Sequence, residues 1–127
     1  MSRRTSVLIV DDNDLMRTLL RSILRGDAYE VIGEARNGNI AVELARRLRP
    51  AIVCLDVMMP EKDGIAALRE IKADNPEIAV VMVTANASAE NVSEAIQHGA
   101  AGFIVKPFNA ARVLDTLARA SAGQGNR

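Results

Sequence analysis

Five polar side chains of this chain each stand directly after a short apolar run. Asp11 and Asp12 follow the first run, Asp56 a second, Thr84 a third and Lys106 the last. In an open sheet flanked by helices, the groups that do chemistry collect beyond the carboxyl ends of the strands. Any one of these residues could cap a helix or form a turn, but five of them at run ends indicate a common site.

The chemistry of this set points to a cation and a phosphoryl group. Three clustered carboxylates repel one another, so burial alone would drive one of them to take up a proton. A divalent cation removes that conflict, and Mg²⁺ fits best because it binds through one or two carboxylates and leaves positions for phosphate oxygens. His98 and Cys54 lie elsewhere in the sequence, so zinc is not indicated. Carboxylates, a cation, a lysine and a hydroxyl suit phosphoryl transfer onto a carboxylate.

The segments that must position these residues alternate in kind. Solid apolar runs, typical of strands buried on both faces, cover 7–10, 51–55, 78–83 and 102–105, and a more alternating segment at 29–36 is typical of an edge strand. Helical apolar spacing covers about 15–24, 41–48, 64–71, 92–99 and 110–117, with N-cap residues at Asp63, Ser88 and Asn109. Five β-α units predict an α/β fold, a parallel sheet with helices on both faces.

Length and composition restrict the class of protein. The 127 residues suffice for one domain with one core. The 16 Lys+Arg balance 16 Asp+Glu and only 2% of residues are aromatic, which argues against binding nucleic acid through bulk charge or base stacking. The apolar runs are too short for a signal sequence or a membrane span. We therefore expect a single cytoplasmic domain over 1–127, with a core over about 6–121 and a flexible tail over 122–127.

Taken together, the motifs resemble those of two-component response regulator receiver domains, over about residues 6–121. The matching segments are Val10-Asp11-Asp12, Leu55-Asp56-Val57-Met58-Met59-Pro60, Asp63-Gly64, Val83-Thr84-Ala85 and Lys106-Pro107-Phe108. The resemblance implies a flavodoxin-like fold with the strand order 2-1-3-4-5 that the family's chemotaxis regulators have. It also implies a phosphorylation-dependent signalling switch that catalyses only its own phosphorylation and dephosphorylation, and is not otherwise an enzyme.

The resemblance further implies which residues accept the phosphoryl group and hold the metal. Asp56 would be the phosphoacceptor, receiving the group from a sensor histidine kinase or a histidine phosphotransfer protein. Asp11, Asp12, Asp56 and the backbone carbonyl of Met58 would hold Mg²⁺, or Mn²⁺ in its place.

Three further residues would act on the phosphoryl group or respond to it. Lys106 would pair with that group, and Thr84 would hydrogen-bond it and move inward. Phe103 would then turn inward behind the threonine. The Lys106–Pro107 bond is expected to be cis, as in the family.

The chain departs from the family pattern in places. Phe103 replaces a frequent tyrosine, and Lys62 stands at a loop position that is often apolar. The segment 99–103 lacks the acidic pair that regulators with winged-helix output domains commonly carry, which argues against such a transcription factor. On the first predicted helix, Arg17, Arg21 and Arg25 form a stripe that we interpret as a solvated face, with kinase docking as the alternative.

In this family the helices at 92–99 and 110–117, with the strand between them, form the output surface. Helical spacing assigns Ile96 and Leu114 to the core and leaves charged residues such as Glu94 and Arg112 outside. We therefore expect no large exposed apolar residue there. The expected state is a monomer, with at most a weak, salt-sensitive dimer or transient docking to an unknown output protein after activation. No direct contact with nucleic acid or membrane is expected.

Other interpretations were weighed against this one. The chain could be the receiver portion of a larger response regulator or hybrid kinase, and residues 121–127 do not decide this. A phosphohydrolase with an aspartyl-phosphate intermediate is disfavoured, because its second acid would stand at position 58, which is Met58. An FMN-binding protein is disfavoured because the loop after the first strand is not rich in hydroxyl groups and glycine.

Overall fold

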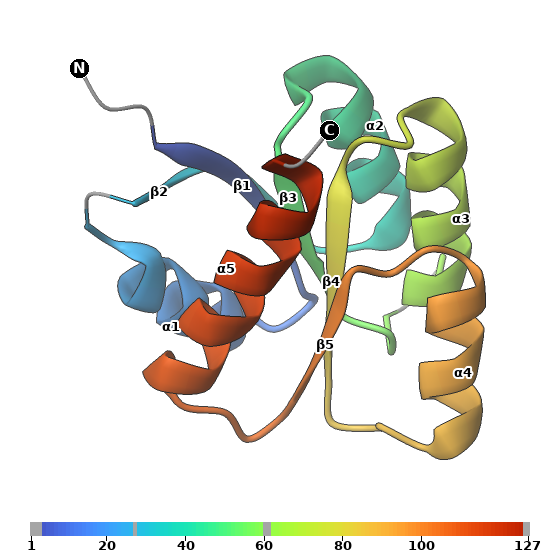
Figure 1. Cartoon of the computed structure of the whole chain (residues 1–127). Helices are drawn as coiled ribbons and strands as arrows, with labels where there is room; N and C mark the ends of the chain where they lie inside the picture. Colours follow the sequence, from blue (N-terminus) through green and yellow to red (C-terminus); the bar gives the residue numbers. More distant parts are fainter. Residues whose placement is uncertain (1–3, 27, 60–61, 126–127) are drawn as a thin grey trace.

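A computed structural model of the chain describes residues 4–26, 28–59 and 62–125, with side chains up to residue 122. Strands and helices alternate along the chain, as Figure 1 shows. Their bounds are β1 (Thr5–Val10), α1 (Asp14–Leu24), β2 (Tyr29–Ala35), α2 (Gly38–Leu48), β3 (Ile52–Leu55), α3 (Gly64–Asp74), β4 (Ala79–Thr84), α4 (Ala89–Gln97), β5 (Gly102–Val105) and α5 (Ala110–Gly125). Every predicted element is present. Pro60, which belongs to the family motif, lies outside the described residues.

The five strands form one parallel sheet in the order β2-β1-β3-β4-β5. This confirms the flavodoxin-like fold and its strand order. Helices α1 and α5 cover one face of the sheet, and α2, α3 and α4 cover the other (Figure 1). Because all strands run in the same direction, the carboxyl ends of β1, β3, β4 and β5 meet at one edge, where the predicted site residues stand.

The core consists of two apolar layers, one on each face of the sheet. Successive side chains of a strand point to opposite faces, so Val53 and Leu55 of β3 join the layer under α2 and α3, whereas Ile52 and Cys54 join the layer under α1 and α5. Burial raises the pKa of the Cys54 thiol to about 12, so this group stays protonated. Cys54 is a small core residue, as the sequence indicated.

Polar side chains start the helices. The predicted caps Asp63, Ser88 and Asn109 accept hydrogen bonds from the backbone N–H groups three residues later, at 2.9, 3.1 and 2.8 Å. Asn13 and Asn37 cap α1 and α2 in the same way, although neither cap was predicted from the sequence. A cap of this kind stabilises a helix by about 1 kcal/mol, so each helix has a fixed start next to the sheet.

Helix α5 continues past the expected end of the core at residue 121. It extends to Gly125, so residues 122–125 of the expected tail are helical, and residues 126 and 127 lie outside the described residues. Ala120, just before this extension, is buried in the layer under α5 and anchors the last part of the helix by packing. Helix propensity does not explain the extension, because two of its four residues are glycine. Among the described residues, no helix has the length and apolar character that crossing a bilayer requires.

Candidate functional site

Backbone hydrogen bonds extend the strand ladders beyond the strand ends and fix the site residues. Asp11 donates its backbone N–H to the carbonyl of Ala35 at 3.0 Å, and Asp56 donates to the carbonyl of Val10 at 3.0 Å. Lys106 donates to the carbonyl of Thr84 at 2.8 Å. The side chains of these residues therefore start from a rigid edge of the sheet.

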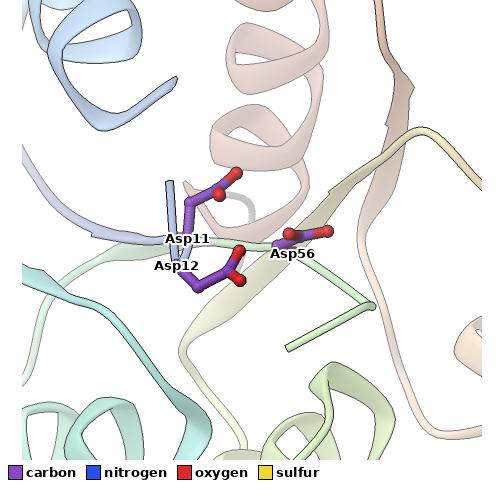
Figure 2. A group of neighbouring side chains, drawn as sticks. All are labelled: Asp11, Asp12 and Asp56. Atoms are coloured by element: carbon purple, nitrogen blue, oxygen red, sulfur yellow. The ribbon is translucent and has the colours of Figure 1, made fainter. Parts of the chain in front are cut away.

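The three predicted carboxylates come together at this edge. One oxygen each of Asp11, Asp12 and Asp56 lies within 4.8 Å of the other two, and Figure 2 shows the three side chains as neighbours. Asp11 and Asp56 are buried, whereas Asp12 is exposed. Solvent therefore reaches the site at Asp12, whereas the other two acids are enclosed by the protein.

Lys106 reaches the same acids from β5. Its Nζ lies 2.7 Å from Asp11 Oδ2 and 3.6 Å from Asp56 Oδ2. The opposite carboxylate oxygens accept backbone hydrogen bonds, Asp11 Oδ1 from Asn13 at 2.9 Å and Asp56 Oδ1 from Met58 at 3.3 Å. One ammonium group thus lies beside two of the three clustered carboxylates, so the cluster has more acidic than basic groups.

The pKa of Asp56 is raised to about 6, first by burial and then by the negative charges of Asp11 and, to a smaller extent, Asp12. Lys106 and the backbone N–H of Met58 act in the opposite direction without cancelling the rise in pKa. Converging carboxylate oxygens with unbalanced charge are the ligands that a hard divalent cation such as Mg²⁺ prefers, so the residues present fit the metal that the sequence predicts.

The remaining predicted residues lie at the end of β4, on β5 and in the loop after β3. Thr84 is fully buried, and its Oγ1 accepts a hydrogen bond from Asn86 N at 3.1 Å. Phe103 is half-buried against the core layer under α2–α4. The Met58 side chain is 60% exposed, so only its backbone is available to the site. The Lys106–Pro107 peptide bond is cis, as predicted.

Two residues support the site in roles that were not predicted from the sequence. Arg17 donates from Nη1 to the backbone carbonyl of Asp11 at 2.6 Å and from Nε to Glu34 at 3.1 Å, and its side chain is only 15% exposed. The interpretation as a solvated face is therefore wrong for Arg17. Gly64 donates its N–H to Val57 at 2.8 Å and passes so close to Asp56 that a Cβ would lie 2.1 Å from the Asp56 carbonyl oxygen. A glycine directly after the N-cap Asp63 was the signal for this close approach.

The predicted output surface carries apolar side chains, contrary to expectation. Ile96 is 65% exposed, Val105 47% and Leu114 38%. Helix α4 packs at the edge of the sheet, and Ala95 is its only buried residue. The apolar stripe of α4 is therefore wider than the neighbouring surface that could cover this stripe. The assignment of Ile96 and Leu114 to the core is therefore wrong.

Comparison with known proteins places this geometry in a family. Residues 7–118 match the family model of the response regulator receiver domain. The chemotaxis protein CheY of Listeria monocytogenes is 45% identical over 115 residues, which cover 91% of this chain and 97% of that protein.

Solved structures agree. The response regulator domain of Thermotoga maritima CheB has a TM-score of 0.88 at 33% identity, covering 94% of this chain and 98% of that one. A chain of the CheX–CheY–BeF₃–Mg²⁺ complex of Borrelia burgdorferi has a TM-score of 0.86 at 33% identity, covering 89% and 86%. Fold, acidic edge and family model agree, and the chain belongs to the response regulator receiver domain family, with similarity to its chemotaxis members.

Proposed function

We propose that this chain is a phosphorylation-dependent switch in which Asp56 accepts a phosphoryl group from a sensor histidine kinase or a histidine phosphotransfer protein. The observation that carries the proposal is the position of the Asp56 carboxylate, buried beside two other acids and 3.6 Å from the ammonium group of Lys106. A structural carboxylate has no need of this setting, whereas a carboxylate that receives a phosphoryl group needs cations on the incoming oxygens.

In the proposed reaction a carboxylate oxygen of Asp56 attacks phosphorus of the phosphohistidine. An O–P bond forms, the P–N bond breaks, and its electron pair returns to the imidazole. Mg²⁺ or Mn²⁺, held by Asp11, Asp12, Asp56 and the carbonyl of Met58, would neutralise charge on the acids and the phosphoryl oxygens. Lys106 exchanges its ion pair with Asp11 for one with the phosphoryl group.

Labelling with a small phosphodonor tests this proposal. Acetyl phosphate should phosphorylate the wild-type protein when Mg²⁺ is present and not after chelation, because the acids otherwise repel the donor. Asp56→Asn should abolish labelling, whereas Asp115→Asn, at an exposed acid paired with Arg119, should leave it unchanged. Intact mass spectrometry measures both. Labelling of Asp56→Asn at the wild-type rate would contradict the assignment.

We further propose that Thr84 transmits phosphorylation to Phe103. Thr84→Ala should still accept the phosphoryl group but lose most of the conformational response, since a hydrogen bond to a charged group contributes about 1.5–3 kcal/mol, at least tenfold in a two-state equilibrium. Amide chemical shifts near Phe103, with and without beryllofluoride, measure the response. Thr116→Ala, which removes the hydroxyl on α5 that bonds Arg112, is the control. Equal shifts in Thr84→Ala and wild type would exclude the hydroxyl as the trigger.

Helix α1 is the proposed docking site for the phosphodonor. It starts directly beyond Asp12 at the acidic edge, and Leu15 and Leu19, one turn apart, are 70% and 40% exposed. These apolar side chains, rather than the arginine stripe, favour α1 as a contact surface, since Arg17 and Arg21 are both paired with Glu34.

The α4–β5–α5 surface, with exposed Ile96, Val105 and Leu114, is the proposed contact for an output protein or a second copy. Three partly exposed side chains are too few for the roughly 1,000 Å² that a stable interface buries. Sedimentation should therefore show a monomer, and at most weak association with beryllofluoride. That association should be less salt-sensitive than ion pairs alone would make it. A tight dimer of the unphosphorylated protein in high salt would contradict this.

The second candidate is the same switch within a larger protein. The matched Thermotoga domain is the response regulator domain of CheB, so receivers this similar occur as parts of other proteins. An aspartyl-phosphate hydrolase stays disfavoured, because Met58 supplies no acid two residues after Asp56.

A further inference from the structure

Two of the three clustered acids are neighbours in the chain, at the point where β1 ends and the loop to α1 begins. Asp11 still belongs to the strand ladder, because its N–H donates to the carbonyl of Ala35 at 3.0 Å. Asp12 lies beyond the strand and is exposed. The peptide group between these two acids therefore sets how the carboxylate of Asp12 lies relative to that of Asp11.

The side chain of Arg17 holds this peptide group. The backbone carbonyl of Asp11 accepts a hydrogen bond from Arg17 Nη1 at 2.6 Å. Because a peptide group is planar, a bond to its oxygen also fixes the direction in which the chain enters Asp12. Arg17 stands in the first turn of α1, and its side chain is only 15% exposed, so the protein rather than solvent surrounds the guanidinium group.

The guanidinium group of Arg17 is itself held by two carboxylates. Its Nε donates to Oε1 of Glu34, on β2, at 3.1 Å, and its Nη2 pairs with Asp14. Glu34 is partly buried whereas Asp14 is exposed, so solvent screens the bond to Glu34 less. The N–H groups of a guanidinium have fixed directions, so the bond from Nε to Glu34 also sets the direction of Nη1.

Arg21, one turn further along α1, provides a comparison within the same helix. It pairs with the other carboxylate oxygen of Glu34, and its side chain is 46% exposed. In the described part of the chain, its hydrogen bonds and ion pairs include no residue of the acidic cluster. Two arginines that share one acidic partner therefore differ in their contact with the site.

We propose that Arg17, oriented by Glu34, is a positioning residue for the cation site: it holds the peptide group between Asp11 and Asp12 so that both carboxylates face one cation. The inference rests on the proposed function, because the arrangement of these acids matters only if the cluster binds a cation. Arg17 acts through the backbone and does not contact the cation or the phosphoryl group.

The charge of Arg17 would by itself have the opposite effect on the site. A positive group close to the acids repels Mg²⁺, so its removal should tighten Mg²⁺ binding if only charge matters. Removal of a group that orients the ligands should instead weaken binding. The two roles therefore predict changes of opposite sign in the Mg²⁺ dissociation constant.

A Mg²⁺ titration followed by amide chemical shifts tests this role. Arg17→Met keeps an unbranched stem but removes the donors and the charge, and it should raise the dissociation constant about tenfold, the size typical for loss of a group that orients a metal ligand. Arg17→Lys keeps the charge but not the guanidinium fork, and it should raise the constant by less. Arg21→Met and Arg21→Lys are the matched controls and should stay close to the wild type, because Arg21 does not bond the Asp11 carbonyl.

The outcomes separate the inference from the proposed function. If the wild-type protein binds Mg²⁺, but Arg17→Met binds it as tightly as Arg21→Met or more tightly, the positioning role is overturned. If Arg17→Met does not fold, Arg17→Lys against Arg21→Lys decides by the same comparison. If the wild type binds Mg²⁺ but Asp56 is not labelled, the proposed phosphorylation fails and the comparison of variants still decides the positioning role. If the wild type does not bind Mg²⁺, both fail.

Discussion

Asp56→Asn is expected to stabilise the metal-free protein against unfolding by about 3 kcal/mol near pH 7. The pKa of Asp56 rises from 3.8 to about 6 on folding, because the carboxyl is buried and faces Asp11. Each pKa unit corresponds to about 1.36 kcal/mol, so the native protein holds an ionised group at this cost. Asparagine keeps the shape of the side chain and carries no charge.

The sign of the effect sets its pH dependence. Below about pH 4 the carboxyl is protonated in both states, and the substitution should change little. As the pH rises from about 4 to 6, the unfolded chain releases this proton while the native protein retains it, so wild-type stability falls relative to that of Asp56→Asn. Above about pH 6 the difference should stay constant.

Urea unfolding with a chelator, at several pH values between about 4 and 7.5, measures this difference. Asp115→Asn is the control, since that exposed acid lies on α5 and pairs with Arg119 one helical turn away. Adding Mg²⁺ should stabilise the wild type and narrow the gap, because a ligand that binds only the native state stabilises it by mass action. A gain of equal size at pH 4 and pH 7.5 would show that ionisation of the Asp56 carboxyl is not its cause.

The fold was predictable because β1, β3, β4 and β5 are continuous apolar runs rich in β-branched residues, β2 alternates as an edge strand does, and each helix repeats its apolar positions at helical spacing. Residues such as Val53 and Val81 are fully buried, as the solid runs indicated. The acidic site was predictable for a related reason. A parallel sheet brings the ends of its strands to one edge, so residues as distant as Asp11 and Lys106 could be placed together before any contact was known.

Apolar periodicity says which residues share a helix face, but not how much of that face the fold covers. Leu15 on α1, Ile96 on α4 and Leu114 on α5 all lie in the predicted apolar stripes, yet they are exposed because the neighbouring elements cover only part of each stripe. The size of the neighbouring surface depends on the whole arrangement, which no local pattern contains.

Contacts between segments that are distant in the sequence could not be predicted either. Arg17 bonds the backbone of Asp11 only because α1 turns back along β1, and Gly38 meets Lys62 only because the loop after β3 lies across α2. The residue types gave hints, a glycine at a helix start and a lysine where apolar residues are common. Neither residue type indicates which other residue it contacts.

Gly64→Ala is expected to destabilise the protein by about 3 kcal/mol or more, at the upper end for an overpacked site. The new Cβ would lie 2.1 Å from the carbonyl oxygen of Asp56 and 2.7 Å from the Cα of Val57. Both atoms belong to the backbone, so relief requires the start of α3 to move away from the end of β3. That movement would break the hydrogen bond from Gly64 to Val57 and leave two buried groups without partners.

The substitution should also impair the site at temperatures where the variant is still folded. Asp56 is the residue that the added methyl group pushes, so phosphorylation by acetyl phosphate should slow at least tenfold, a size typical for a small displacement of a reacting group. Thermal unfolding and labelling rates of Gly64→Ala and Gly33→Ala, measured in parallel, separate this local clash from a general cost of alanine. In Gly33→Ala the methyl group meets only leucine side-chain ends, which can move. Equal stabilities of the two variants would mean that α3 can move away from Asp56 at little cost, and the close approach would then not explain why glycine stands at position 64.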